Sequence, residues 1–172
     1  MNMITAPIVR RGFTLIELLI VIALLGALAI GLLATIDPFE QLKKGRDTST
    51  RNTTLEFYNA ELRYYSTKAT FSWPTSSTFV ATPVSSMGSD ITALIGAGEL
   101  KNQFIQLAGT GNLAKIYTSS TSSENLAVCF KPESKSFQID PATIFGSDGQ
   151  TSGATCKSQT SVGGTDCYYC VQ

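Results

Sequence analysis

Residues 13–36 read FTLIELLIVIALLGALAIGLLATI, and in this stretch Glu17 is the one charged residue. From Leu18 onward the stretch consists of Leu, Ile, Val, Ala and Gly with a single Thr. An α-helix rises about 1.5 Å per residue, so a helix of this length covers roughly 36 Å, which is enough to cross a bilayer. We therefore predict that residues 13–36 form an apolar helix able to span a membrane.

The flanks of this helix predict its orientation. Arg10 and Arg11 precede it, and the positive-inside rule then favours a cytoplasmic N-terminus. A cleaved secretory signal would need a small-residue site after the apolar region, and residues 34–38 (ATIDP) are a poor version of one. A permanent membrane anchor explains the length and the orientation. It does not explain Glu17, because a carboxylate in lipid is costly and normally has a partner.

Residues 11–23 (RGFTLIELLIVIA) resemble the N-terminal signature of bacterial type IV pilins and the related pseudopilins. The resemblance implies that a prepilin peptidase cuts between Gly12 and Phe13, removes the leader of residues 1–12, and methylates the new terminal amine of Phe13. The apolar helix is then retained. It leaves the membrane by packing against identical subunits in a helical filament, driven by an assembly platform and an ATPase.

The same resemblance implies a role for Glu17, whose carboxylate would lie beside the terminal amine of Phe13 in a neighbouring subunit. A buried ion pair penalises every register that leaves one charge alone, so Glu17 would fix the assembly register. The simpler alternative is that this carboxylate reaches the lipid headgroups from the helix end. Three small residues at four-residue spacing also mark a face where a second helix can approach closely, although such residues are common in membrane helices generally; they are Ala23, Ala27 and Gly31.

Residues 37–66 are predicted to continue as an amphipathic helix. Asp37 is a candidate N-cap, and Pro38 suits the first helical position. Helical spacing predicts one apolar face, formed by Leu55, Tyr58, Leu62 and Tyr65. Gly45 and residues 48–54 are poor helix formers, so we expect a less regular middle. Four cations fall close together and would meet either the acidic groups of a neighbour or solvent; they are Lys43, Lys44, Arg46 and Arg51.

Residues 67–172 are predicted to form a Ser- and Thr-rich head. One or two short helices are expected between residues 90 and 108, and strands over residues 113–118, 126–130 and 136–139, the last two joined as a hairpin. A small antiparallel sheet packed on the long helix gives an α+β fold. The hydroxyl-rich loops suit either an exposed extracellular surface or O-glycosylation.

The four cysteines all lie near the C-terminus, on the side that the topology places outside the membrane; they are Cys129, Cys156, Cys167 and Cys170. Disulfides are expected there, and four cysteines allow three pairings. Cys167-x-x-Cys170 also has half of a zinc-site spacing, but the other two cysteines lack a matching motif, and no strand-to-helix context supports a redox role. In many pilins a disulfide pins the C-terminal region to the sheet, and these positions loosely resemble that arrangement.

Composition excludes several classes of function. Thirteen basic and thirteen acidic residues give zero net charge, so no nucleic-acid partner is expected, and the absence of histidine removes the usual general base. Three aspartates near the C-terminus could serve as calcium ligands but lack EF-hand spacing; they are Asp140, Asp148 and Asp166. We therefore expect no metal, no cofactor and no enzymatic activity.

The expected function is that of a pilus subunit, with a pseudopilin of a secretion or DNA-uptake apparatus and an adhesive minor pilin as alternatives. The precursor is expected in the cytoplasmic membrane and the assembled subunit at the cell surface.

Overall fold

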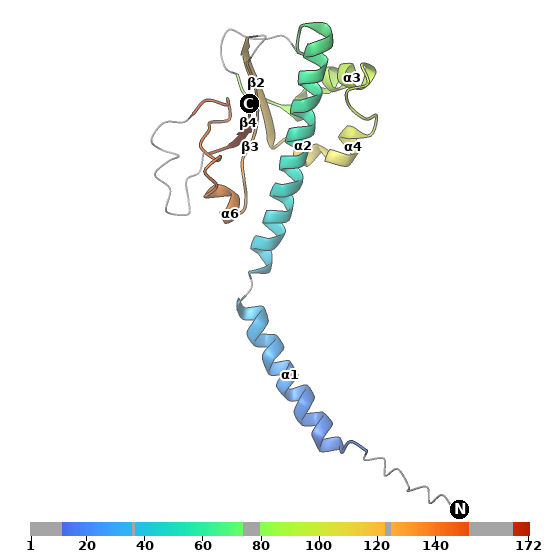
Figure 1. Cartoon of the computed structure of the whole chain (residues 1–172), viewed down its shortest axis with the longest axis vertical. Helices are drawn as coiled ribbons and strands as arrows, with labels where there is room; N and C mark the ends of the chain where they lie inside the picture. Colours follow the sequence, from blue (N-terminus) through green and yellow to red (C-terminus); the bar gives the residue numbers. More distant parts are fainter. Residues whose placement is uncertain (1–11, 36, 74–79, 123–124, 152–166) are drawn as a thin grey trace, which may run out of the picture. The chain divides into compact units, whose positions relative to one another are not determined.

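The computed structural model of the chain describes residues 12–35, 37–73, 80–122, 125–151 and 167–172. These residues fall into two compact units, residues 1–38 and residues 39–172 (Figure 1). Among the described residues, the first unit contains one helix, and the second contains a long helix, a small sheet and several short helices.

The first unit is helix α1 (Leu15–Thr35). Its segment Leu15–Leu33 is long and apolar enough to cross a membrane, judged by length and composition. Large apolar side chains on every side of the helix are exposed, for example Ile16 at 66% and Leu33 at 74%. Since this surface has no polar side, it requires a hydrophobic environment that the first unit does not itself provide.

Helix α2 (Pro38–Lys68) begins at Pro38, as predicted, and continues without interruption. The expectation of an irregular middle was wrong. Threonine hydroxyls in this region donate hydrogen bonds to carbonyl oxygens one turn earlier, so they are satisfied inside the helix. The donors are Thr48, Thr50, Thr53 and Thr54. Thr54 is fully buried against the rest of the unit, and this packing outweighs the weak helix propensity of the run.

The predicted apolar face of α2 was wrong in part, because Tyr58 and Tyr65 pack against the core but Leu62 does not. Leu62 is 40% exposed, whereas Asp47 and Glu61 are buried at 3% and 0% exposure. The buried face carries Asp47, Thr50, Thr53, Thr54, Phe57, Ala60 and Glu61. The spacing of apolar residues does not predict this buried face, because several of its residues are polar. Their side chains form hydrogen bonds within the unit.

The sheet has four strands, β1 (Thr82–Pro83), β2 (Ile116–Ser122), β3 (Asn125–Phe130) and β4 (Tyr169–Val171), in the order β1-β2-β3-β4 with antiparallel neighbours. Antiparallel strands were predicted over parts of β2 and β3. The α+β fold is as predicted, with a long N-terminal helix, a small antiparallel sheet and a disulfide in the C-terminal region.

The predicted hairpin was misplaced. It joins β2 to β3, and the expected strand over residues 136–139 is instead helix α6 (Lys135–Gln138). The side chain of Ser134 caps this helix by accepting a hydrogen bond from the backbone amide of Phe137. The Ser134 side chain thus provides an acceptor for a backbone amide of the first helical turn. This cap favours a helix over a strand at residues 135–138.

Short elements complete the second unit: the 3-10 helix η1 (Val84–Ser86) and helices α3 (Gly88–Gly96), α4 (Phe104–Ala108) and α5 (Thr110–Leu113). In the view of Figure 1, α3 and α4 lie to one side of α2 and the labelled strands to the other. Helices α3 and α4 agree with the short helices predicted between residues 90 and 108.

One core joins α2, the short helices and one face of the sheet. Phe57 on α2, Leu94 on α3 and Val128 on β3 belong to it, and each is 0% exposed. A second, smaller cluster on the opposite sheet face contains Ala127, Cys129 and Cys170. Alternation along β3 therefore puts Val128 in one cluster and Cys129 in the other, as expected for a strand covered on both faces.

Candidate functional site

The N-terminal end of α1 is held by three reciprocal hydrogen bonds between Thr14 and Glu17. Glu17 Oε2 accepts from the backbone amide of Thr14 at 2.8 Å and from its hydroxyl at 2.7 Å, and the amide of Glu17 donates to Thr14 Oγ1 at 3.3 Å. This is a capping box, in which residues three apart satisfy the free donors of the first helical turn. Thr-x-x-Glu before an apolar run is its sequence signature, so this contact was readable from the sequence and was missed.

The capping box fixes where the single carboxylate of α1 lies. Glu17 is held at the helix end, three residues from Thr14 and four from Phe13, whose side chain is 83% exposed. A carboxylate at a helix N-terminus also interacts favourably with the partial positive charge of the free amides there. The structure thus holds this carboxylate against Thr14, the residue that follows Phe13.

The three small residues predicted to form a packing face lie on the exposed surface of α1; they are Ala23, Ala27 and Gly31. A Cβ added at Gly31 would meet no atom within 4 Å, so no described residue of the first unit covers this position. The face is open to a second helix.

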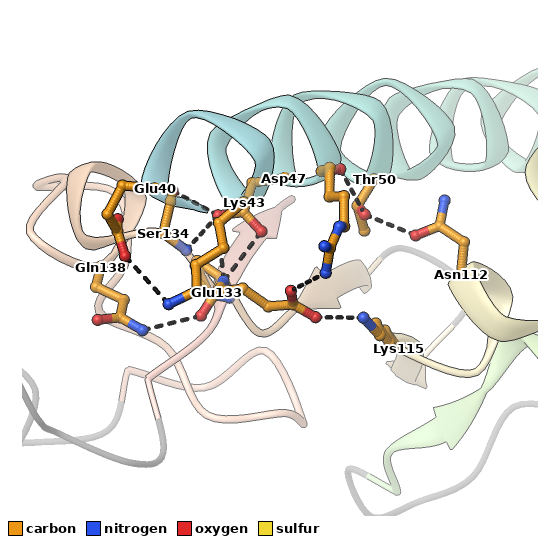
Figure 2. Close-up of polar contacts among 11 residues, drawn as sticks. Glu40, Lys43, Asp47, Thr50, Asn112, Lys115, Glu133, Ser134 and Gln138 are labelled. Carbon is orange, nitrogen blue, oxygen red and sulfur yellow. Dashed lines mark hydrogen bonds and ion pairs between the residues drawn. The ribbon is translucent and has the colours of Figure 1, made fainter. Parts of the chain in front are cut away.

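In the second unit, the buried carboxylate of Asp47 joins α2 to the segment after β3 (Figure 2). It accepts hydrogen bonds from the amide of Glu133 at 3.0 and 3.1 Å, and from the amide and the hydroxyl of Ser134 at 2.7 and 2.6 Å. Asp47 is therefore satisfied by neutral donors although it is 3% exposed. We call the contacts of Asp47 and Glu40 with residues 133–135 the α2 clamp.

Glu40 makes the second contact of the α2 clamp. Its Oε2 atom accepts from the backbone amide of Lys135 at 3.0 Å, and its Oε1 atom pairs with Lys43 Nζ at 3.1 Å. The hydrogen bond from Lys135 and then that from Lys43 lower the pKa of the Glu40 carboxyl. The first turns of α2 are thereby attached to the start of α6.

Glu133 connects two cations from different elements. It pairs with Arg46 of α2 at 3.3 Å and also with Lys115, which directly precedes β2. The hydrogen bond from Lys115 is the main cause that lowers the pKa of Glu133. These groups are partly exposed, so the pairs contribute modestly to stability and mainly fix positions.

The cation cluster predicted on α2 is largely engaged within its own chain. Besides the pairs of Lys43 and Arg46, Arg51 Nε donates to the hydroxyl of Tyr169 at 3.1 Å, and its guanidinium lies 5.1 Å from the centre of that ring. Arg46 thus links α2 to the segment after β3, Arg51 links it to β4, and Lys43 pairs within α2 itself.

A disulfide joins Cys129 of β3 to Cys170 of β4, at directly opposed positions of the two strands. Cys167 is also disulfide-bonded, while Cys156 lies outside the described residues. The disulfide pins the last strand to the sheet, in the way that the resemblance implied. It also contradicts the zinc alternative, because these cysteines carry no free thiolate to bind a metal.

The aspartates considered as calcium ligands serve local turns. Asp140 Oδ1 accepts from the amide of Ala142 at 2.8 Å, and Asp148 Oδ1 accepts from the amide of Gln150 at 3.1 Å. Asp166 lies outside the described residues. Within the part of the chain that the structure describes, no three acidic, cysteine or histidine side chains gather as metal ligands do.

Comparison with protein families gives a match at the N-terminal end of the chain. Residues 9–33 match the model of the prokaryotic N-terminal methylation motif. This motif is the signature of type IV prepilins and pseudopilins, and the chain carries it at the place where the capping box and the apolar helix lie. Comparisons with curated proteins and with solved structures found no match. The motif implies a structural protein that is processed by prepilin peptidase and polymerises into filaments, and it fits a membrane-anchored precursor.

Proposed function

We propose that this protein is a structural subunit of an extracellular type IV pilus. The observation that carries the proposal is the coincidence of the methylation motif at residues 9–33 with a helix whose apolar surface is exposed all round. Such a helix is stable only in lipid or among other apolar helices. A subunit stored in the membrane and then packed into a filament core uses both environments in turn.

Processing starts the change from one environment to the other. The prepilin peptidase cuts between Gly12 and Phe13 and methylates the amine of Phe13. The cut removes the leader of residues 1–12 together with Arg10 and Arg11, which hold the N-terminus on the cytoplasmic side. The mature subunit then consists of the apolar helix, α2 (Pro38–Lys68) and the head that follows α2.

Glu17 gives the assembly its register. Its carboxylate is held at the helix end by Thr14, close to its own Phe13. In the filament it pairs with the amine of Phe13 of a neighbouring subunit, and the faces carrying Ala23, Ala27 and Gly31 pack closely. An unpaired charge in the apolar core is costly, so other registers are disfavoured.

The partners of the mature chain are identical subunits, and the assembly platform with its ATPase acts on them indirectly. The chain itself performs no catalysis and binds no cofactor, metal or nucleic acid in this proposal. The head and its disulfide form the outer surface of the fibre.

Shearing of cells that produce the chain tests the proposal. Surface fibres are removed mechanically, imaged by electron microscopy and analysed by mass spectrometry. Long filaments built of this subunit support the pilus, whereas a processed chain confined to the cell envelope contradicts it and favours the pseudopilin. Glu17→Ala should abolish the fibres, and Glu56→Ala, which removes an exposed carboxylate from α2, should leave them unchanged.

A further inference from the structure

Glu61 is a buried carboxyl group that the proposed assembly does not use. It lies on α2 with 0% exposure, and it contacts the chain that follows the helix. Ser72 donates to it twice, from its amide to Oε2 at 3.2 Å and from its hydroxyl to Oε1 at 2.6 Å. Glu61 is therefore the polar link between α2 and residues 71–73.

Residues 71–73 also complete an aromatic cluster. The ring of Trp73 stacks on Phe57 of α2 at 6.2 Å between centroids and on Phe71 at 5.5 Å, and Phe71 contacts Tyr65 at 5.0 Å. Such contacts contribute beyond simple burial of area. The Glu61–Ser72 hydrogen bonds and this cluster hold the same short segment, so loss of one weakens the other.

The electrostatic surroundings of Glu61 oppose its ionised form. In the described chain no cation contacts it, and the strands, η1, α4 and α5 contain no charged residue. The acidic side chain of Asp90 on α3 acts on it from the neighbouring element, and Arg63 on α2 is paired with Glu99. Burial is the main cause that raises the pKa of Glu61 to about 7, and it outweighs the two hydrogen bonds from Ser72. Burial also raises the pKa of Asp90.

We propose that the Glu61 carboxyl is a protonation-dependent latch that holds residues 71–73 against α2. The protonated group keeps its hydrogen bonding with Ser72 at little desolvation cost. The ionised group is a buried charge whose hydrogen-bond donors among the described residues are the amide and the hydroxyl of Ser72, and opening of the segment lets water reach it. The head thus has a closed form at mildly acidic pH and a loosened form at mildly alkaline pH. This inference concerns the second unit alone and does not depend on the proposed function.

Trp73 is a direct reporter, because it is the one tryptophan in the sequence. Its emission is recorded on the full chain in non-ionic detergent from about pH 5 to about pH 9, a range in which ordinary carboxyl and tyrosine groups do not titrate. We expect a reversible red shift with a midpoint near the pKa of Glu61, about 7. Glu61→Gln cannot ionise and should remove the shift, and Glu56→Gln, an exposed change on the same helix, should titrate as the wild type does.

A second variant keeps the test decisive if Glu61→Gln fails to fold. Ser72→Ala removes a hydroxyl that lowers the pKa of Glu61, so the midpoint should move to higher pH. An emission spectrum that does not change with pH in the wild type would overturn the latch. A transition that persists in Glu61→Gln, or a midpoint unaffected by Ser72→Ala, would assign the titration to another group and also overturn it.

Discussion

Asp47 and Ser134 lie 87 residues apart in the sequence, and the Asp47 carboxylate accepts hydrogen bonds from the amide of Ser134 at 2.7 Å and from its hydroxyl at 2.6 Å. The same serine caps α6. One buried carboxylate therefore fixes the end of β3 against α2 and sets the start of the next helix. Contacts between residues this far apart in the sequence hold the segment after β3 against α2.

Removal of this carboxylate should destabilise the head. Asp47→Ala leaves the amides of Glu133 and Ser134 and the hydroxyl of Ser134 without their acceptor, which we expect to cost about 3 kcal/mol. Urea unfolding followed by far-UV circular dichroism measures this change. Glu56→Ala on the exposed side of α2 is the control and should stay within about 0.5 kcal/mol of the wild type. Equal stability of the two variants would refute the α2 clamp as a stabilising feature.

The stability of the head should fall as the pH rises through the mildly acidic range. The pKa of Glu61 is about 7 in the folded chain and 4.5 for an ordinary glutamate, so the unfolded state ionises first. The contribution of Glu61 to the free energy of unfolding is complete below pH 4.5 and declines between pH 4.5 and about 7. Above that pH it no longer changes. The total change is at most roughly 3 kcal/mol.

The difference in unfolding free energy between the wild type and Glu61→Gln isolates this effect from other carboxyl groups. Glu40 and Glu133, whose pKa values are lowered, act in the opposite direction, because their contributions are lost as the pH falls. They titrate in both proteins and cancel in the difference. A difference that is independent of pH would contradict the titration of Glu61.

The disulfide between Cys129 and Cys170 should stabilise the C-terminal strand. Replacement of both residues by alanine is expected to cost about 2–4 kcal/mol, because the unfolded chain regains the freedom of the closed loop. Thermal unfolding with and without a reducing agent checks the direction, since reduction should lower the midpoint in the wild type. Non-reducing peptide mapping should recover a peptide that joins Cys129 to Cys170. Alkylation of either thiol in the native protein would disprove the pairing.

The negative charge of Glu17 should matter more for filament assembly than the hydrogen bond between its carboxylate and the Thr14 hydroxyl. Glu17→Ala removes the carboxylate, whereas Thr14→Val removes only the hydroxyl that donates to it at 2.7 Å. Both variants should insert into the membrane and lose the leader. We expect a greater loss of sheared filaments from Glu17→Ala than from Thr14→Val, as quantified by immunoblotting. Normal filament yield from Glu17→Ala would exclude the pairing with Phe13.

The parts of the fold that were predicted correctly are those encoded by local pattern. The apolar run of α1, the restart at Pro38 and the short apolar run of β3 each predict their element from a few neighbouring residues. The contacts of Asp47 and Glu61 were not predictable in this way, because their partners lie elsewhere in the chain and polar residues carry no periodic apolar signal. The same reason explains why Leu62 was placed on the wrong face.

The candidate site also has parts that a local sequence pattern predicts and parts that depend on contacts between distant residues. The motif around Gly12, Phe13 and Glu17 is contiguous and was found at once, whereas the pairing of Cys129 with Cys170 needed the register of β3 and β4. The segment after β3 shows how one residue changes the outcome. Ser134 caps a helix, and Asp47 accepts a hydrogen bond from its hydroxyl. Residues 135–138 therefore form α6 and not a strand.

The mass of the mature chain shows whether the apolar helix is retained through maturation. The chain is recovered from sheared fibres, and its intact mass and N-terminal peptide are determined. We predict that it begins at methylated Phe13, and that Gly12→Leu keeps the leader attached. A mature chain that begins downstream of Ile36 and is recovered as a soluble monomer would contradict the account.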